Sequence, residues 1–239
     1  MLEAELSASA LASAVGVDVK SVARWVSEDR IPYPVTRAKV ARLLNHRESF
    51  FWPSLAYRDD MSDELVAELD RIWPTRSAIS DDAWHRLFSS AKAQLDILVC
   101  AGAFLLDTLD LADILSWKAG SGTVVRVLVG DPESAAVRMR ASELSLPWLP
   151  ERCRSTGNYL RQVVGQPNVE VRLHGTTLYA SQFRFDQTVV VNTHAFEAWA
   201  SRSPALQLTG TGNAGLFDFY AAAFQRVWAT ASRLSNAAD

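Results

Sequence analysis

The second half of the chain alternates strand-like and helix-like segments, and this alternation limits the folds that it can adopt. From residue 96 the apolar runs DILVCAG and TVVRVLVGDP are each followed by a segment with helical spacing of its apolar residues. Such a pattern predicts βαβ units, with a mixed or parallel sheet covered by helices. Further strands are predicted at 169–173, 178–185, 188–192 and 205–208, before a final helix at 214–234.

The first 50 residues carry signals for short helices only. Ser7 is predicted to cap a helix that stops at Gly16, and a second helix is predicted to start near Asp18 or Val19. Two short helices joined by such a turn form the helix-turn-helix pattern. A third helix is predicted over 35–44, and the apolar side chains expected to face inward from the second helix are Val17, Val22 and Val26.

These patterns predict a two-domain α+β protein. A small all-α helix-turn-helix domain is expected at 1–50, and an α/β domain with a mixed sheet at 79–239. Between them, 51–78 is interpreted as a linker and connecting helix, the helix being capped by Ser62 and carrying Leu65, Leu69 and Ile72. Ser80 is predicted to cap the next helix.

The distribution of charge is uneven. The whole chain carries a net charge of −3, yet residues 18–47 hold seven basic and three acidic side chains. A local basic segment on an acidic protein indicates one face that binds a polyanion. The longest apolar run, 97–106, is about half of what a membrane-spanning helix needs. We therefore expect a cytoplasmic protein without a membrane partner, its two cysteines, Cys100 and Cys153, being reduced thiols.

The second helix carries the residues that reading a DNA major groove requires. Short polar and basic side chains near its start would contact base edges, and flanking cations would contact phosphates. We expect base contacts from Lys20, Ser21 and Arg24, and phosphate contacts from Arg30, Arg37 and Lys39. The alternative interpretation is an ordinary three-helix packing subdomain whose charges are solvated.

A family resemblance supports the first interpretation. The Arg24-Trp25 pair, the Pro32-Tyr33-Pro34 element and Trp52-Pro53 look like the DNA-binding domain of Xre-type (Cro/repressor-like) helix-turn-helix regulators of actinobacteria, over residues 7–55. The resemblance implies a transcription regulator that binds double-stranded DNA. Because one such module contacts few base pairs, a homodimer is expected.

Residues 96–231 resemble a single phospholipase D-type unit, the domain that those regulators often carry. In phospholipase D enzymes a histidine, a lysine, an aspartate and a Gly-Ser pair form the site. Here His174 matches the histidine, Thr176 stands in place of the lysine, Asp186 matches the aspartate, and Asn192-Thr193 stands in place of Gly-Ser. Single-unit members of that family typically pair, which again implies a homodimer.

The missing lysine argues against catalysis. Loss of one stabilising donor costs about 10²–10³ in rate, and no lysine follows Lys118. Arg172 is the nearby cation that would share a strand face with His174. We therefore expect no enzymatic activity, and a pocket for a phosphate-bearing small molecule formed by His174, Thr176, Tyr179, Ser181, Asn192 and His194. The structural alternative is that these side chains only satisfy buried hydrogen bonds.

Other functions stay open from the sequence. A phosphodiesterase or nuclease would use His174 as nucleophile and His194, from a partner chain, as acid. A module that docks on proteins would use the helices without DNA. The run GTGNAG at 210–215 fits the G-x-G-x-x-G dinucleotide pattern, but no second strand follows its helix, so a flexible loop is favoured. No metal spacing and no cofactor motif occur, so neither is predicted.

Overall fold

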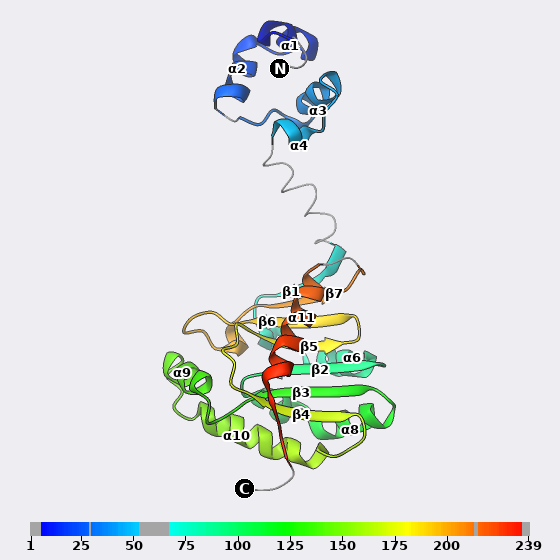
Figure 1. Ribbon diagram of the computed structural model, residues 1–239, viewed down its shortest axis with the longest axis vertical. Helices are drawn as coiled ribbons and strands as arrows, with labels where there is room; N and C mark the ends of the chain where they lie inside the picture. Colours follow the sequence, from blue (N-terminus) through cyan, green and yellow to red (C-terminus); the bar gives the residue numbers. More distant parts are fainter. Residues whose placement is uncertain (1–5, 29, 53–66, 213–214, 236–239) are drawn as a thin grey trace. The chain divides into compact units, whose positions relative to one another are not determined.

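The computed structural model describes residues 6–28, 30–52, 67–212 and 215–235, and the chain is α+β (Figure 1). It divides into two compact units, residues 1–65 and 66–239. The first is helical, and the second contains an eight-stranded mixed sheet. No helix in the described part of the chain is long and apolar enough to cross a membrane.

Local capping sets the first two helices. α1 (Ala8–Val15) begins where Ser7 Oγ accepts a hydrogen bond from Ala10 N–H, and it ends at Gly16, whose φ is 77°. Glycine adopts this left-handed conformation without strain. α2 (Val19–Ser27) begins at Asp18, whose carboxylate accepts from Lys20 N–H at 2.7 Å. The predicted Ser7 cap, the stop at Gly16 and the start of the second helix are confirmed.

The helical unit has a small core of its own. α3 (Pro34–Leu43) and the short α4 (Glu48–Phe51) complete it. Trp52 is buried, and its ring lies edge-on to Trp25 at 6.5 Å between centroids. Val26 was expected in this core but is 64% exposed, because α2 buries only Val22 against its short neighbours. The buried residues that form this core cluster are Leu11, Ala12, Val15, Val22, Val40, Leu44 and Trp52.

The sheet of the second unit has the order β1-β7-β6-β5-β2-β3-β4-β8. β2, β3 and β4 are parallel, and the remaining pairs are antiparallel, so the predicted mixed sheet is confirmed. The strands are β1 Leu69–Trp73, β2 Gln94–Val99, β3 Val124–Gly130, β4 Val169–His174, β5 Ala180–Phe185, β6 Thr188–Thr193, β7 Ala205–Thr209 and β8 Ser232–Arg233.

Helices cover both faces of this sheet. In Figure 1, α11 crosses in front of the strands, and α6 and α8 lie behind them. Behind the sheet, Trp84 and Phe88 of α6 pack with Phe183 of β5, whereas Phe217 and Phe224 of α11 pack on the other face. The helices are α6 Asp81–Ser90, α7 Ala103–Thr108, α8 Leu111–Gly120, α9 Ala135–Glu143, α10 Leu149–Leu160 and α11 Leu216–Thr230, with 3-10 turns η1 Arg76–Ala78, η2 Arg161–Val163 and η3 Ala200–Arg202.

Two sequence predictions are corrected by this topology. Residues 69–73, predicted to be helical, form β1, because pairing with β7 supplies backbone hydrogen bonds at the sheet edge. The predicted linker 51–78 therefore ends earlier, since β1 and η1 belong to the second unit. The cap predicted at Ser62 lies outside the described residues. α10 was missed, because Pro150 and Gly157 within it argue against a helix.

The loop with the G-x-G-x-x-G pattern leads to a helix whose start is already occupied. The buried carboxylate of Glu68 accepts hydrogen bonds from Leu216 and Phe217 N–H, at 2.6 and 3.2 Å. A dinucleotide pyrophosphate would need this same helix start. A Cβ on Gly215 would lie 2.2 Å from a Glu68 oxygen, so this glycine admits the carboxylate. Gly215 of this pattern therefore leaves room for the Glu68 carboxylate, which caps the start of α11.

Glu68→Ala is expected to lower the free energy of unfolding of the second unit by about 1–2 kcal/mol, because α11 loses its cap. Urea denaturation of the full chain measures this change. Glu68→Gln keeps one oxygen acceptor and should cost less than Glu68→Ala. Equal effects of the two substitutions, or no effect of either, would show that the cap does not stabilise α11.

Candidate functional site

The exposed side of α2 is the first candidate site. Lys20 and Arg24 are exposed, whereas Ser21, expected to face outward, is half-buried. Ser21, Arg24 and Arg30 line one hollow of about 270 Å³, with the exposed ring of Tyr33 at its edge. Three of the residues predicted to contact DNA therefore lie around one concave surface of the helical unit.

The cations of this unit differ in what they already bind. Within residues 6–28 and 30–52, the side chains of Lys20, Arg24, Arg30 and Lys39 make no hydrogen bond or ion pair. Arg37 differs, because its Nε lies 2.5 Å from Glu48 Oε2. That pairing neutralises Arg37, which makes it the weakest of the predicted phosphate contacts.

The second candidate site lies at one edge of the sheet. β2, β3, β4 and β6 end there and β5 begins there. In the register of the sheet, Val99 of β2 pairs with Val129, Gly130 of β3 pairs with His174 of β4, and Ser181 of β5 pairs with Asn192 of β6. In sheets with parallel strands, ligands bind at the carboxyl ends of the strands. Two cavities, of about 250 and 260 Å³, share the lining residues Cys100, Arg140 and His194.

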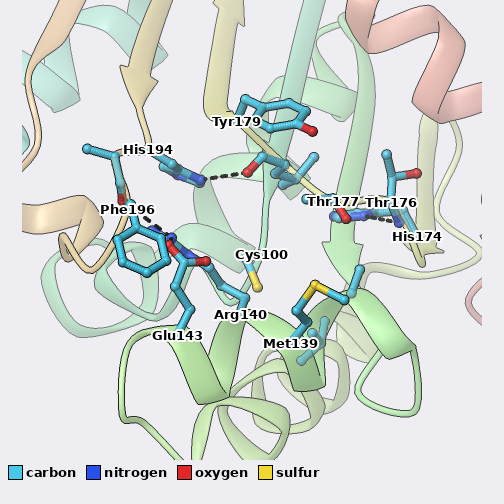
Figure 2. Close-up of a pocket in the computed structure, with 14 residues that line it drawn as sticks. Cys100, Met139, Arg140, Glu143, His174, Thr176, Thr177, Tyr179, His194 and Phe196 are labelled. Atoms are coloured by element: carbon cyan, nitrogen blue, oxygen red, sulfur yellow. Dashed lines mark hydrogen bonds and ion pairs between the residues drawn. The ribbon is translucent and has the colours of Figure 1, made fainter.

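All six residues predicted to bind a ligand line one or both cavities. The first cavity is lined by His174, Thr176, the exposed Tyr179 and His194 (Figure 2). The second is lined by Ser181, Asn192 and His194. Figure 2 shows the two histidines on opposite sides of the first cavity, with Cys100 and Arg140 between them.

His174 is held by the backbone through both ring nitrogens. It is 2% exposed, its Nε2 lies 3.0 Å from the Val99 carbonyl oxygen, and its Nδ1 accepts from Thr176 N–H at 3.3 Å. A carbonyl only accepts, so Nε2 carries the proton and donates it. Burial lowers the pKa of this histidine. A nucleophile needs a free lone pair, and here the Nδ1 lone pair is used by Thr176.

His194 forms a pair with Ser181. Its Nδ1–H donates to the Leu178 carbonyl at 3.3 Å, so its Nε2 accepts from Ser181 Oγ–H at 3.1 Å. This is the arrangement of a nucleophile and its base. Burial lowers the pKa of His194 to about 4, and the charges of Arg140 and Arg76 lower it further than Glu143 raises it. An imidazole that resists protonation is a weak general base, so the arrangement favours binding over proton abstraction.

The depressed pKa of His194 makes stability depend on pH. His194 takes up a proton near pH 6.5 in the unfolded chain and near pH 4 in the folded chain. The stability that neutral His194 contributes is therefore fully present above about pH 6.5 and is lost as the pH falls toward about 4. We expect unfolding free energy to fall by about 2 kcal/mol more between about pH 7 and pH 5 in the wild type than in His194→Gln. Urea denaturation at both pH values measures this, and identical pH dependence in the two proteins would contradict it.

Two other residues of the predicted site have structural roles. Asp186 lies at the β5–β6 turn, the opposite end of the hairpin from Ser181, and its carboxylate accepts from the N–H groups of three consecutive residues, 92–94. Burial raises the pKa of this carboxyl, but the three donors and Arg184 lower it by more. Arg172 pairs with Glu170 at 2.7 Å and stacks on Trp228, so its guanidinium is already engaged.

The cavities also contain side chains that the sequence did not single out. Arg140 of α9 pairs with Glu143 and donates to the carbonyls of Ala195 and Ala198, which anchors the loop after β6. Arg76 comes from η1, more than 100 residues before Asn192 in the sequence. No local spacing links such residues. Cavity residues from segments that meet only through the sheet topology cannot be identified from the sequence.

Metal binding finds no support in the described part of the chain. It contains no group of three or more histidine, cysteine, aspartate or glutamate side chains that could hold an ion. Cys100 and Cys153 are free, with their sulfur atoms 4.0 Å apart. Cys153 Sγ also lies 3.4 Å from the Cys100 carbonyl oxygen, to which it donates.

Comparisons with known proteins give distant structural likenesses. No family model and no curated protein matches the chain. The archaeal chromatin protein TrmBL2, described as showing a novel mode of DNA binding, is 12% identical with a TM-score of 0.43, covering 95% of this chain and 88% of that one. Nuc, a phospholipase D family member from Salmonella typhimurium, is 12% identical with a TM-score of 0.41, covering 68% of this chain and 97% of that one.

A third structure is phosphatidylserine synthase from Haemophilus influenzae Rd KW20. It is 14% identical with a TM-score of 0.45, and the match covers 79% of this chain and 47% of that one. All three TM-scores are below 0.5, so the functional argument rests on the residues and their geometry.

Proposed function

We propose that this protein is a sequence-specific DNA-binding transcription regulator, with α2 as the helix that enters the major groove. The observation that carries the proposal is the exposed side of α2, where Lys20 and Arg24 make no side-chain hydrogen bond or ion pair within the described helical unit. Lys20 in the first turn and Arg24 in the last turn of this exposed, Asp18-capped helix are cations without partners, which suit contacts with bases and phosphates.

The second unit is proposed to bind a small ligand and to pair two chains, without catalysis. Thr176 stands where the resemblance to phospholipase D would place a lysine, and both ring nitrogens of His174 are engaged by the backbone. Pairing follows from the small number of base pairs that one module contacts, since two half-sites raise affinity and fix spacing. Phosphodiester hydrolysis that His174→Ala abolishes would favour the alternative, a phosphodiesterase or nuclease.

Salt dependence of DNA binding tests the proposed function. Each phosphate that the protein neutralises makes log affinity fall with log salt by about 0.9. Lys39→Ala should reduce the magnitude of this slope by about 1. Lys92→Ala, an exposed lysine of the sheet-containing unit, should leave the slope unchanged. Absence of DNA binding, or equal slopes for the two variants, would favour the alternative in which the helices dock on another protein.

A further inference from the structure

The second cavity has aromatic walls. It measures about 260 Å³ and is lined by Phe104 of α7, by Trp148 at the start of α10 and by Trp199 before η3. The two tryptophan rings lie edge to face with their centroids 6.4 Å apart. Flat apolar side chains around a concave space favour a flat apolar ligand.

One cation in this cavity has no anion. The guanidinium of Arg76 lies 3.6 Å from the centre of the Phe104 ring, and no described residue gives it a hydrogen bond or a carboxylate. Burial lowers the pKa of Arg76 to about 10, which shows that its surroundings disfavour charge. The acidic residue that lines this cavity, Asp107, lies 3.7 Å from Arg152 instead. A half-buried cation of this kind is stabilised by an anionic ligand.

Asn192, another residue that lines this cavity, has a buried acceptor that lacks a partner among the described residues. Asn192 is fully buried, and its Nδ2 donates to the carbonyls of Ser203 and Pro204 at 3.2 and 3.0 Å. These two acceptors fix which end of the amide is nitrogen. Its Oδ1 has no hydrogen-bond partner in the described structure. A buried acceptor without a donor is unfavourable, so a ligand hydroxyl that donates to it would be stabilised.

We propose that this cavity binds a small aromatic carboxylate that also carries a hydroxyl group. The carboxylate would pair with Arg76, the ring would lie among Phe104, Trp148 and Trp199, and the hydroxyl would donate to Asn192 Oδ1. The inference deepens the proposed function by naming the chemical class of the effector. Free phosphate lacks the apolar body that these walls accommodate.

Binding of 4-hydroxybenzoate to the full-length protein tests the proposal. Titration calorimetry and tryptophan fluorescence, which Trp148 and Trp199 should report, are measured without DNA. We expect binding with a dissociation constant below about 1 mM. The Arg76→Met variant should bind at least about tenfold more weakly, a loss equivalent to about 1.4 kcal/mol. Arg86→Met, which replaces an exposed arginine of α6 outside both cavities, should bind like the wild type.

Two further probes test the contributions of the carboxylate and of the aromatic ring. 4-Hydroxybenzyl alcohol lacks the carboxylate, and inorganic phosphate lacks the ring, so both should bind more weakly than 4-hydroxybenzoate. The proposal is overturned if 4-hydroxybenzoate does not bind, if Arg76→Met binds it like the wild type, or if either probe binds as tightly. DNA binding is measured separately, so failure of the regulator assignment leaves the cavity result intact, and the reverse also holds.

Discussion

Replacing Asp96 with alanine is expected to lower the free energy of unfolding of the sheet-containing unit by about 3–5 kcal/mol. Asp96 lies on β2 in the middle of the sheet and is 2% exposed. Its two carboxylate oxygens accept from Arg126 Nε and Nη2 at 2.7 and 2.8 Å. Gln94 also donates to it at 2.7 Å, and Arg184 lies at 3.9 Å.

The cost arises from the cations that Asp96→Ala leaves behind. Arg126 and Arg184 are largely buried, with 15% and 17% of their side chains exposed. Arg126 also lies over the rings of Phe224 and Trp228, so α11 holds it in place beside the sheet. Without Asp96 the two guanidinium groups lose their shared carboxylate and, among the described residues, keep hydrogen bonds only to neutral oxygens, of Gln225 and of the Asp186 backbone. An uncompensated buried charge is strongly destabilising.

Chemical denaturation of the full chain measures this effect, with unfolding monitored by a signal from the second unit. Asp113→Ala removes an exposed carboxylate in the first turn of α8 and should change the unfolding free energy by less than about 1 kcal/mol. Asp96→Asn keeps an acceptor oxygen and should lie between the two. A loss below about 1 kcal/mol for Asp96→Ala would show that Arg126 finds other partners.

The second large effect is expected on DNA binding. Arg24→Ala should weaken binding to a preferred duplex by about 1–3 kcal/mol, which is roughly a tenfold to hundredfold loss, because a base contact of arginine is worth that much. Arg24 is exposed on α2, has no partner among the described residues, and shares its hollow with Ser21 and Arg30. Fluorescence anisotropy at one fixed salt concentration measures the loss.

The control for Arg24 is another arginine of the same unit. Arg37 is already paired with Glu48, so Arg37→Ala should weaken DNA binding less than Arg24→Ala. If Arg24→Ala weakens binding equally on preferred and random duplexes, Arg24 contacts phosphate and not bases. If its affinity is unchanged on both, α2 is not the reading helix.

Elements set by neighbouring residues could be predicted from the sequence. The cap at Ser7, the stop at Gly16 and the helix start after Asp18 depend on residues within one helical turn, and all three are as predicted. The central strands also follow from local apolar runs that the helices bury. The six residues predicted to bind a ligand line the two cavities because they lie at or beside strand ends that the topology brings to one edge of the sheet.

Features that join distant segments could not be predicted. β1 forms because residues 69–73 meet β7, more than 130 positions later, whereas their own spacing favours a helix. Arg76 reaches the cavity for the same reason. The state of His174 depends on the Val99 carbonyl, 75 residues earlier, so the sequence does not reveal that its lone pair is engaged.

Selection of binding sites from a pool of random DNA duplexes tests the regulator assignment most directly. With the full-length protein, we predict enrichment of one motif as an inverted repeat, its half-sites about 10 base pairs apart from centre to centre or a multiple of that distance. The Arg24→Ala variant should enrich this motif less. A pool that stays random, or that the variant enriches equally, would contradict the account.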